Sequence, residues 1–360
     1  MSYQAAISLG VHVRLLAARA DDSAAQVAPD VVVGPPASWE HVQAFAAGCD
    51  VITFDHELVD PAQLMRLEAA GHCVRPSPAV VALAQNKRRQ RAELGMRGFP
   101  VPPHRPVASA HDVLAFADAY GWPVVAKAAQ GGYDGRGVWL LHDLAGAQAL
   151  LEQTTARGLD LLVEQHVPIE REIAVLVARR PSGDAVVYPV VETVQVNGIC
   201  REVLAPAPIP DRLAVRAKEI GLGIAEAIGA TGILAVELFV AGDQLLINEL
   251  AARPHNSGHF SIEGCVTSQF ENHLRAILDW PLGSPALVAP AVAMANVIGE
   301  SDEDPFTLLP DALAIDGVHV HLYGKAARPG RKLGHVTVVG QDLAEIRARA
   351  SRAARILSNA

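Results

Sequence analysis

The sequence predicts a protein of mixed α/β and α+β fold, built from three successive parts. Short apolar strands alternate with helices up to about residue 85, which is typical of a parallel sheet. A glycine-rich segment follows an apolar strand near residue 130, and two longer apolar strands joined by a tight turn lie near residue 240. With 360 residues, the chain is long for a single core. We place the domains at residues 1–85, 86–290 and 291–360, with a flap subdomain at about 100–160.

The composition narrows the class of protein. Half of the residues are hydrophobic and 19% are charged, so the chain can bury a sizeable core. The net charge of −9, with dispersed basic side chains, argues against a nucleic-acid partner. The most apolar long window, residues 286–298, is too short to span a bilayer and contains Pro290, which argues against a membrane protein. Four scattered cysteines without CxxC spacing favour reduced thiols in a cytoplasmic protein over disulfides or a zinc site.

The first part has predicted strands at residues 11–16, 30–34 and 50–54 and predicted helices at 38–47 and 61–70. In such parallel sheets, ligands bind at the carboxyl ends of the strands. The third strand ends in Asp55-His56-Glu57, which makes Asp55 and Glu57 candidates for a binding site. Two acids on an ordinary loop would give the same pattern, so this interpretation stays open.

A domain boundary follows the first part. Residues 84–91 read as a basic helical turn that runs into 95–106, a stretch with four prolines and two glycines. A run of basic residues usually indicates a solvated helix face. We therefore select only Lys87 from it as a candidate site residue.

The second part opens with a predicted helix at 110–120 and a strand at 123–127 that ends in Lys127, where an ammonium can reach a phosphate. Four glycines fall within residues 131–137, and they let the backbone approach a ligand and aim its N–H groups at phosphate oxygens. No Gly-Lys-Ser/Thr follows, so the segment is not a Walker A loop. It predicts a hairpin flap over a triphosphate. The alternative is a plain turn that binds nothing. Lys127, a few residues upstream, makes this alternative less favoured.

Polar groups end the next strand as well. The strand at 161–167 contains Glu164 and Gln165, which could read an adenine edge, and Glu172 begins the following strand, where it could hold ribose hydroxyls. An amphipathic helix at 212–228 then leads into the longest pair of strands.

Two carboxylates are predicted to share one face of this hairpin. We expect strands at 233–240 and 244–250 with the loop Ala241-Gly242-Asp243, which places Glu237 and Glu249 diagonally on one face. Converging carboxylates need a cation between them, and Mg²⁺ prefers such ligands together with nucleotide phosphates. Two glutamates on a solvated face are the alternative, and a two-residue loop would put them on opposite faces.

Taken in order, a strand lysine, a glycine flap, a Glu-Gln linker and a carboxylate hairpin resemble the ATP-grasp superfamily. Within it, residues 131–137, 248–259 and 323–335 look like motifs of the 5-(carboxyamino)imidazole ribonucleotide synthase family of purine biosynthesis. The resemblance covers nearly the whole chain. It implies an ATP-grasp fold with an N-terminal Rossmann-like pre-ATP-grasp domain and a small C-terminal β domain, which should hold a hairpin at 317–340 and a last helix at 343–357.

The front of the chain departs from the family pattern. The family usually begins with a strand and a GGGQLG-type loop, whereas this chain starts inside the helix that should follow them. We therefore expect the pre-ATP-grasp domain to lack its first strand, which would leave the strands at 11–16 and 51–54 with unpaired backbone groups. Gln195, where a histidine is common, and Asp55-His56-Glu57, where the family more often has two glutamates around an apolar residue, are smaller departures.

The resemblance implies ATP-dependent carboxylation of 5-aminoimidazole ribonucleotide with bicarbonate, through carboxyphosphate, by a cytoplasmic homodimer. The implied substrates and cofactors are ATP, bicarbonate, the ribonucleotide and Mg²⁺ or Mn²⁺. The implied ATP ligands are Lys87, Lys127, Gly132, Tyr133, Asp134, Gly135, Arg136, Gly137, Val138, Glu164, Gln165, His166, Val167, Glu172, Gln195, Asn248 and Glu249. The implied ribonucleotide contacts are Glu57, Tyr133, Asp134, Arg136, Arg253, Lys325 and Arg331; the catalytic group is Arg253, His255 and Asn256, and Glu237 and Glu249 hold the metal.

Two other hypotheses remain open at this stage. Another ATP-grasp ligase, such as a formate-dependent glycinamide ribonucleotide transformylase, would release ADP with formate in place of bicarbonate. An inactive, N-terminally shortened nucleotide-binding relic would bind ATP without turnover. Retention of Lys127, Glu237, Glu249 and Arg253 argues against a relic. We interpret His255 and His259, spaced as HxxxH, as packing and hydrogen-bonding residues and not as a histidine metal site.

Overall fold

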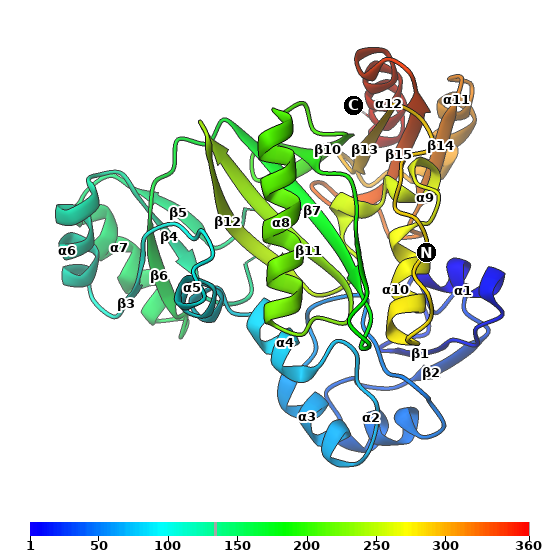
Figure 1. Cartoon of the computed structure of the whole chain (residues 1–360), viewed down its shortest axis with the longest axis horizontal. Coiled ribbons are helices and arrows are strands. Elements are labelled where there is room, and N and C mark those ends of the chain that lie inside the picture. The colour runs from blue at the N-terminus through cyan, green and yellow to red at the C-terminus, as the bar shows by residue number, and fades with distance from the viewer. Residues whose placement is uncertain (133–134, 360) are drawn as a thin grey trace.

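The computed structural model describes residues 1–132 and 135–359, and its centre is a nine-stranded sheet (Figure 1). The strand order is β12-β11-β7-β9-β10-β13-β15-β14, and β8 pairs with β7. The strands are β7 (Arg171–Arg179), β8 (Ala185–Val187), β9 (Val191–Val196), β10 (Ile199–Ala205), β11 (Gly232–Ala241), β12 (Gln244–Ala251), β13 (Ala291–Ile298), β14 (Val318–Leu322) and β15 (Lys332–Gly340). Their pairings are antiparallel, which fits a sheet built largely from hairpins.

Helices cover both faces of this sheet. Alternate residues of β7 point to opposite faces, so Val175 joins the cluster under helix α8 (Asp211–Ala227) while Leu176 joins the cluster on the other face. Helix α10 (Gln269–Ile277) packs against β7 and β11 on the second face, after the short helices η1 (Asn256–Gly258) and α9 (Ser261–Gly264). The sheet is therefore a rigid, buried base for the residues at its strand ends.

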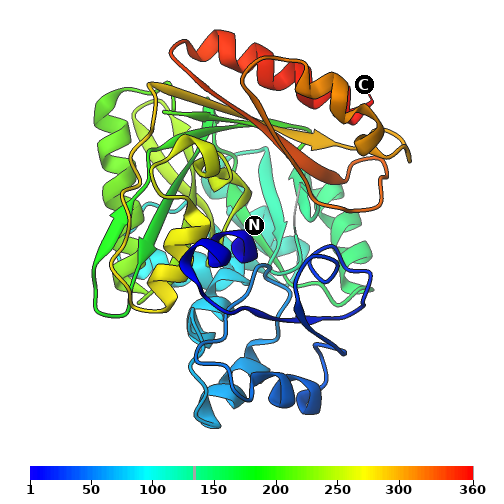
Figure 2. The same cartoon turned by 90° about the vertical axis from the view of Figure 1, so that its right-hand side faces the viewer.

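The strands of the expected C-terminal β-rich part continue the central sheet and do not form a sheet of their own. Met294 of β13 pairs with Val203 of β10, so the central sheet runs on into the C-terminal part. Helix α12 (Leu343–Ser358) covers this end of the sheet (Figure 2), together with η2 (Pro305–Leu308) and α11 (Leu309–Leu313). A shared sheet lets β13 hold residues of the preceding part in place.

The first part contains α1 (Ser2–Leu9), β1 (Arg14–Ala17), β2 (Asp30–Val33), α2 (Trp39–Ala46), α3 (Pro61–Ala69) and α4 (Pro78–Ala84). Strands β1 and β2 pair in parallel as predicted. The predicted strand at 50–54 is wrong: Ile52 makes only an isolated parallel bridge to Val74. Among the described residues, β1 pairs only with β2. Residue 52 is therefore not joined to β1 in a sheet, and its bridge to Val74 does not extend into a strand.

A second, four-stranded sheet in the order β3-β6-β4-β5 forms the flap region. Its strands are β3 (His104–Val107), β4 (Val124–Ala128), β5 (Val138–Leu141) and β6 (Leu161–Gln165), and helices α6 (Ala110–Tyr120) and α7 (Leu144–Thr155) pack on it. The hairpin predicted around the glycine-rich segment is present, since β4 and β5 pair antiparallel across it. The two sheets face each other in Figure 1, with helix α5 (Lys87–Met96) beside the joint between them.

Helix α5 corrects the interpretation of the basic run as a solvated face. Gln90, Arg91 and Leu94 lie three and four positions apart, and all three are buried on the face that contacts β6 and β12. Arg89 on the opposite face is exposed. No described helix is both long and apolar enough to cross a membrane.

Candidate active site

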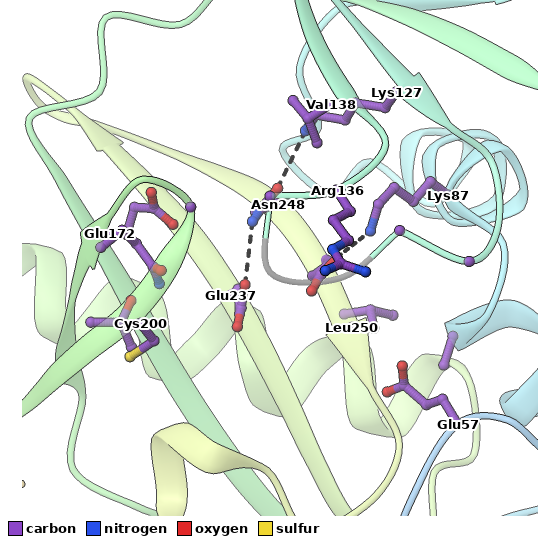
Figure 3. A pocket seen from close by; sticks show the side chains of 18 of the residues that line it. Glu57, Lys87, Lys127, Arg136, Val138, Glu172, Cys200, Glu237, Asn248 and Leu250 are labelled. Carbon is purple, nitrogen blue, oxygen red and sulfur yellow. Dashed lines mark hydrogen bonds and ion pairs between the residues drawn. The ribbon is translucent and has the colours of Figure 1, made fainter. Parts of the chain in front are cut away.

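A cavity of about 1100 Å³ lies between the flap sheet and the central sheet. Figure 3 shows side chains from both sheets, from α5 and from the N-terminal part pointing into it. Predicted site residues that line it are Glu57, Lys87, Lys127, Gly132, Gly135, Arg136, Val138, Glu164, Gln165, His166, Val167, Glu172, Gln195, Glu237, Asn248, Glu249, Arg253, His255 and Asn256. The fold thus gathers residues that are up to two hundred positions apart in the sequence.

Some predicted residues lie elsewhere. Lys325 and Arg331 are outside the cavity wall; Lys325 lies over the Tyr323 ring, and Arg331 donates to the carbonyl of Ala326. Gly137 is not in the wall either, although its φ of +76° supports the turn between β4 and β5. Tyr133 and Asp134 lie outside the described residues. Lys332, next to Arg331, lines the cavity and was not among the predicted site residues.

The turn of the carboxylate hairpin is shorter than predicted. Ala241 pairs with Gln244, which leaves Gly242 and Asp243 as a two-residue turn in place of the expected three-residue loop. Gly242 has a φ of +57°, a conformation that glycine adopts without strain. In a regular ladder, this shorter turn would put the two glutamates on opposite faces.

A β-bulge restores their shared face. Leu238 pairs with Ile247, but the next pair along is Glu237 with Glu249, so Asn248 is the extra residue of the bulge. Glu237 and Glu249 are therefore directly opposite each other and not diagonal as predicted. The bulge also aims Asn248 into the cavity, where its amide donates to Glu237 at 3.3 Å and accepts from Lys127 at 3.3 Å (Figure 3).

The two carboxylates differ in their electrostatics. Burial and the facing Glu249 raise the pKa of Glu237 to about 8. Burial acts in the same direction on Glu249, but its ion pair with Lys87, together with the charges of Lys127 and Arg91, outweighs burial and lowers the pKa of Glu249. Burial and the charge of Glu249 thus favour the protonated form of Glu237 in the absence of a metal ion. This arrangement fits a divalent cation, which would replace the proton.

A cationic wall stands on the flap side of the cavity. Glu164 is 2% exposed and pairs with Arg91 at 2.7 Å and with Lys127 at 2.8 Å. Burial favours the neutral form of Glu164, but the two cations outweigh it and lower the pKa to about 2. Burial, Arg91 and Lys87 together lower the pKa of Lys127 despite the attraction of Glu164. Positive charge exceeds negative charge at this wall, which suits an anionic ligand such as a phosphate chain.

This geometry changes the interpretation of Glu164 and adds Arg91. Both oxygens of the Glu164 carboxylate are paired with cations. The carboxylate is therefore not free to contact a base edge, which was the role expected for it. Arg91 also donates to the carbonyl of Asn248 at 2.7 Å and so connects α5 to the bulge. The signal for Arg91 was its spacing of four from Lys87, which places both on one helix face.

The acid stability of the protein should reveal the Glu164 network. The pKa of Glu164 is lowered, so the stabilising contribution of its ionised carboxylate is present above about pH 4.5 and is lost as the pH falls toward 2. We expect the difference in unfolding free energy between wild type and Glu164→Gln to shrink by about 3 kcal/mol over that range. Denaturant unfolding at several pH values measures it, and a difference independent of pH would contradict the network.

The loop after β12 carries the remaining candidates. Arg253 lies 3.3 Å from Glu57 of the N-terminal part and donates to the carbonyl of Pro254 at 3.0 Å. His255 lies 3.6 Å from Glu237, and its Nδ1 contacts Ser257 Oγ at 2.8 Å. Burial, assisted by Arg253, lowers the pKa of His255 to about 3, so its ring is neutral at physiological pH. As predicted, His255 and His259 hydrogen-bond to protein groups; Nδ1 of His259 contacts Gln269.

Comparisons with known proteins agree with this architecture. Residues 1–85 match a ribonucleotide synthetase preATP-grasp domain, 93–270 an ATP-grasp domain, and 292–349 a phosphoribosylaminoimidazole carboxylase C-terminal domain. The chain is 46% identical to N5-carboxyaminoimidazole ribonucleotide synthase of Mycobacterium tuberculosis over 100% of its length and 85% of the relative. The chain belongs to the N5-carboxyaminoimidazole ribonucleotide synthase family. The Corynebacterium ammoniagenes synthase is 44% identical over 100% of this chain and 89% of the relative.

Solved structures of the family have the same fold. The Thermus thermophilus synthetase superposes with a TM-score of 0.89 at 37% identity, covering 98% of this chain and 94% of that one. The Aspergillus clavatus synthase in complex with ADP and 5-aminoimidazole ribonucleotide gives 0.91 at 31% identity, covering 100% and 96%. These matches confirm the predicted family and the ATP-grasp fold with its pre-ATP-grasp and C-terminal domains. As a family member, the chain is an ATP-grasp ligase.

Proposed function

We propose that this N5-carboxyaminoimidazole ribonucleotide synthase homologue carboxylates 5-aminoimidazole ribonucleotide with bicarbonate, at the expense of ATP, in purine biosynthesis. The observation that carries the proposal is that one cavity joins a cationic wall, a buried carboxylate pair and the Arg253 loop. A binding protein for a nucleotide alone has no need of all three. Formate-dependent transfer lacks such support, because the relatives matched over the whole chain are named as carboxyaminoimidazole synthases.

ATP is proposed to lie along the flap side of the cavity. Lys87, Lys127 and the glycine-rich turn around Gly132 and Gly135 surround the space for its phosphates. The last residue of β6 and the linker after it would meet adenine through the backbone of residues 165–167, since the Glu164 carboxylate is paired elsewhere. The ribose is assigned to Glu172 at the start of β7, and Gln195 of β9 lines the same side.

Glu237 and Glu249 are proposed to hold Mg²⁺ or Mn²⁺. In the described part of the chain, no three His, Cys, Asp or Glu side chains gather to hold a metal by themselves, so nucleotide phosphates would complete the ligand set. A bound cation would neutralise charge on the phosphates as ADP departs. Asn248, between the two glutamates in sequence, would orient them through its bond to Glu237.

The cation requirement gives a direct prediction. Removing divalent cations with EDTA is expected to abolish ADP formation. Glu249→Gln is expected to raise the Mg²⁺ concentration for half-maximal activity at least about 10-fold, since it removes a proposed ligand. Asp243→Asn, on the exposed turn of the same hairpin, is the matched control and should leave that concentration unchanged. An unchanged Mg²⁺ requirement in Glu249→Gln would exclude the assignment.

Carboxylation is proposed to take place beside Arg253. A bicarbonate oxygen attacks the γ-phosphorus, and the bond between the γ-phosphorus and the β-phosphate oxygen breaks. The products of this step are carboxyphosphate and ADP. The exocyclic amine of the ribonucleotide then attacks the carboxyl carbon, the C–O bond to phosphate breaks, and the amine loses a proton. Arg253 offers paired donors to the planar oxyanion, and the neutral His255 with Asn256 would place bicarbonate. Most of the acceleration in such a transfer is positioning and charge neutralisation.

The ribonucleotide is proposed to bind between the N-terminal part and the flap. Glu57 and Arg136 line that side, and burial raises the pKa of Glu57 although Arg253 opposes the shift. Lys332, the first residue of β15, is proposed near its phosphate, with Lys325 and Arg331 on the loop that precedes this strand. We also propose a cytoplasmic location, in line with four free cysteines among the described residues. A homodimer is proposed because the family resemblance implies it.

Steady-state kinetics test the function. ADP release is measured with Mg-ATP while the ribonucleotide and bicarbonate are added or withheld, and with formate in place of bicarbonate. We expect release that depends on both the ribonucleotide and bicarbonate. Formate dependence would identify a different ligase, and ATP binding without release would identify a relic.

A further inference from the structure

Two buried side-chain amides lie behind the segment that carries His255 and Asn256, and neither lines the cavity. We propose that Gln269 and Asn296 are positioning residues for the carboxylation step. They fix His255 and Asn256 in the orientation that places bicarbonate. This inference rests on the function proposed above and extends it to residues that touch no substrate.

The side-chain amide of Gln269 hydrogen-bonds to both the N–H and the carbonyl of His255, and we call this pair of bonds the amide clamp. Gln269 Oε1 accepts from the His255 N–H at 2.9 Å, and Gln269 Nε2 donates to the His255 carbonyl at 2.8 Å. The same Nε2 contacts His259 Nδ1 at 2.9 Å. A pair of bonds to one residue fixes its peptide planes much as strand pairing does. Gln269 is fully buried, so water does not compete for these bonds.

The surroundings leave the clamp no room to shift. A Cβ added at Gly258 would lie 2.2 Å from Leu176 and 2.5 Å from Gln269 Oε1, so the loop packs tightly on both. Ser261 Oγ donates to the Gly258 carbonyl at 2.6 Å and accepts from the Gln269 N–H at 2.9 Å. The first turn of α10 and the loop therefore form one hydrogen-bonded unit.

Asn296 holds the neighbouring residue from the C-terminal part. The amides of Asn296 and Asn256 bond reciprocally, at 2.9 Å and 2.8 Å. Asn296 Nδ2 also donates to the carbonyl of Cys200, which lines the cavity, at 2.9 Å. Asn296 lies on β13, which belongs to the C-terminal domain and is anchored by its pairing with β10 and β15. Adjacent residues of the active-site loop are thus fixed by two different parts of the chain.

The chain offers a matched control on the same helix. Asn272 is as fully buried as Gln269 and makes the same kind of two-sided amide clamp, to the N–H of Gly283 at 2.8 Å and its carbonyl at 3.1 Å. It also donates to Tyr188 Oη at 2.8 Å. Gly283 does not line the cavity. A loss of folding stability alone should affect Asn272→Leu as much as Gln269→Leu.

The test compares wild type, Gln269→Leu, Asn296→Leu and Asn272→Leu for thermal stability, kcat and KM values. We expect Gln269→Leu and Asn296→Leu to lower kcat/KM for bicarbonate about 10- to 100-fold, because a small misplacement of a positioned group has such an effect. KM for ATP should change less than about 2-fold, since the ATP residues lie on other elements. Asn272→Leu should lose a similar amount of thermal stability and keep wild-type kinetics.

Gln269→Glu adds a readout that a purely structural role would not move. An ionised carboxyl can accept from the His255 N–H but cannot donate to its carbonyl, whereas a protonated carboxyl can do both. Burial raises the pKa of such a carboxyl. The facing titratable group, His259, has a pKa well below its ordinary value and stays neutral across the range. Activity relative to wild type should therefore rise as the pH is lowered from 8.5 to 6.

The outcomes separate the two proposals. A folded wild type without ribonucleotide-dependent ADP release overturns the proposed function, and the positioning role with it. If the wild type is active but Gln269→Leu and Asn296→Leu have the same kinetics as Asn272→Leu, only the positioning role is overturned. If Gln269→Leu does not fold, Asn296→Leu and the pH profile of Gln269→Glu decide, and a flat profile with normal bicarbonate kinetics contradicts the clamp.

Discussion

Replacing Arg253 with alanine is expected to lower kcat about 100- to 1,000-fold. The guanidinium lies at the cavity wall, 3.3 Å from Glu57, at the end of the strand that carries Glu249. Donors aimed at charge that develops in the transition state contribute this much in other enzymes. Because the group is proposed to act on carboxyphosphate and not at the adenosine end of the nucleotide, the affinity for ADP should change little.

Arg253→Lys and Glu57→Gln complete this comparison. Lysine keeps the charge but not the paired donors, so we expect a partial loss of kcat. Glu57→Gln removes the ion pair while leaving Arg253 in place, which should raise KM for the ribonucleotide more than it lowers kcat. Rates are measured by ADP release, and affinity by titration calorimetry with ADP. Wild-type kcat in Arg253→Ala would remove the residue from the mechanism.

Replacing Arg91 with methionine is expected to lower the free energy of unfolding by about 3 to 5 kcal/mol. Arg91 is fully buried and bonds both the Glu164 carboxylate and the Asn248 carbonyl. Removing one partner of a buried ion pair leaves the other charge uncompensated, and this is the source of the large effect. Lys127 remains beside Glu164, so the lower part of the range applies if it alone keeps Glu164 ionised.

The same helix provides the control for Arg91. Arg88, three residues earlier, is partly exposed and lies 3.5 Å from the exposed Asp160. Arg88→Met is expected to change stability by no more than about 0.5 kcal/mol. Denaturant unfolding of the two variants gives the comparison. Equal effects would mean that the Arg91 network adds no more stability than a surface pair.

Placement at the cavity was predictable for candidate residues that lie at the end of an apolar strand. Lys127 near the end of β4 and Arg253 just after β12 follow this rule, and both line the cavity. Family motifs extended the prediction to the flap and to the loop around His255. The predicted residues share one cavity because the two sheets face each other. The family resemblance implied this arrangement, but it cannot be derived from the spacing of residues in the sequence.

The errors came from places where tertiary contacts outweigh local pattern. The bulge at Asn248 depends on bonds to Arg91 and Lys127 from other elements, so no counting of turn residues could place it. Arg91 looked solvated because its partner, Glu164, is distant in the sequence. Residues 50–54 have a strand composition but find only one bridge, since strand formation needs a neighbouring strand as well as suitable residues.

The origin of the phosphate oxygen tests the central claim most directly. The enzyme is incubated with Mg-ATP, the ribonucleotide and ¹⁸O-labelled bicarbonate, and the released phosphate is analysed by mass spectrometry. If bicarbonate attacks the γ-phosphorus and the amine then captures the carboxyl carbon, each phosphate released should carry one bicarbonate oxygen. Unlabelled phosphate would contradict a carboxyphosphate route and, with it, the function assigned to this cavity.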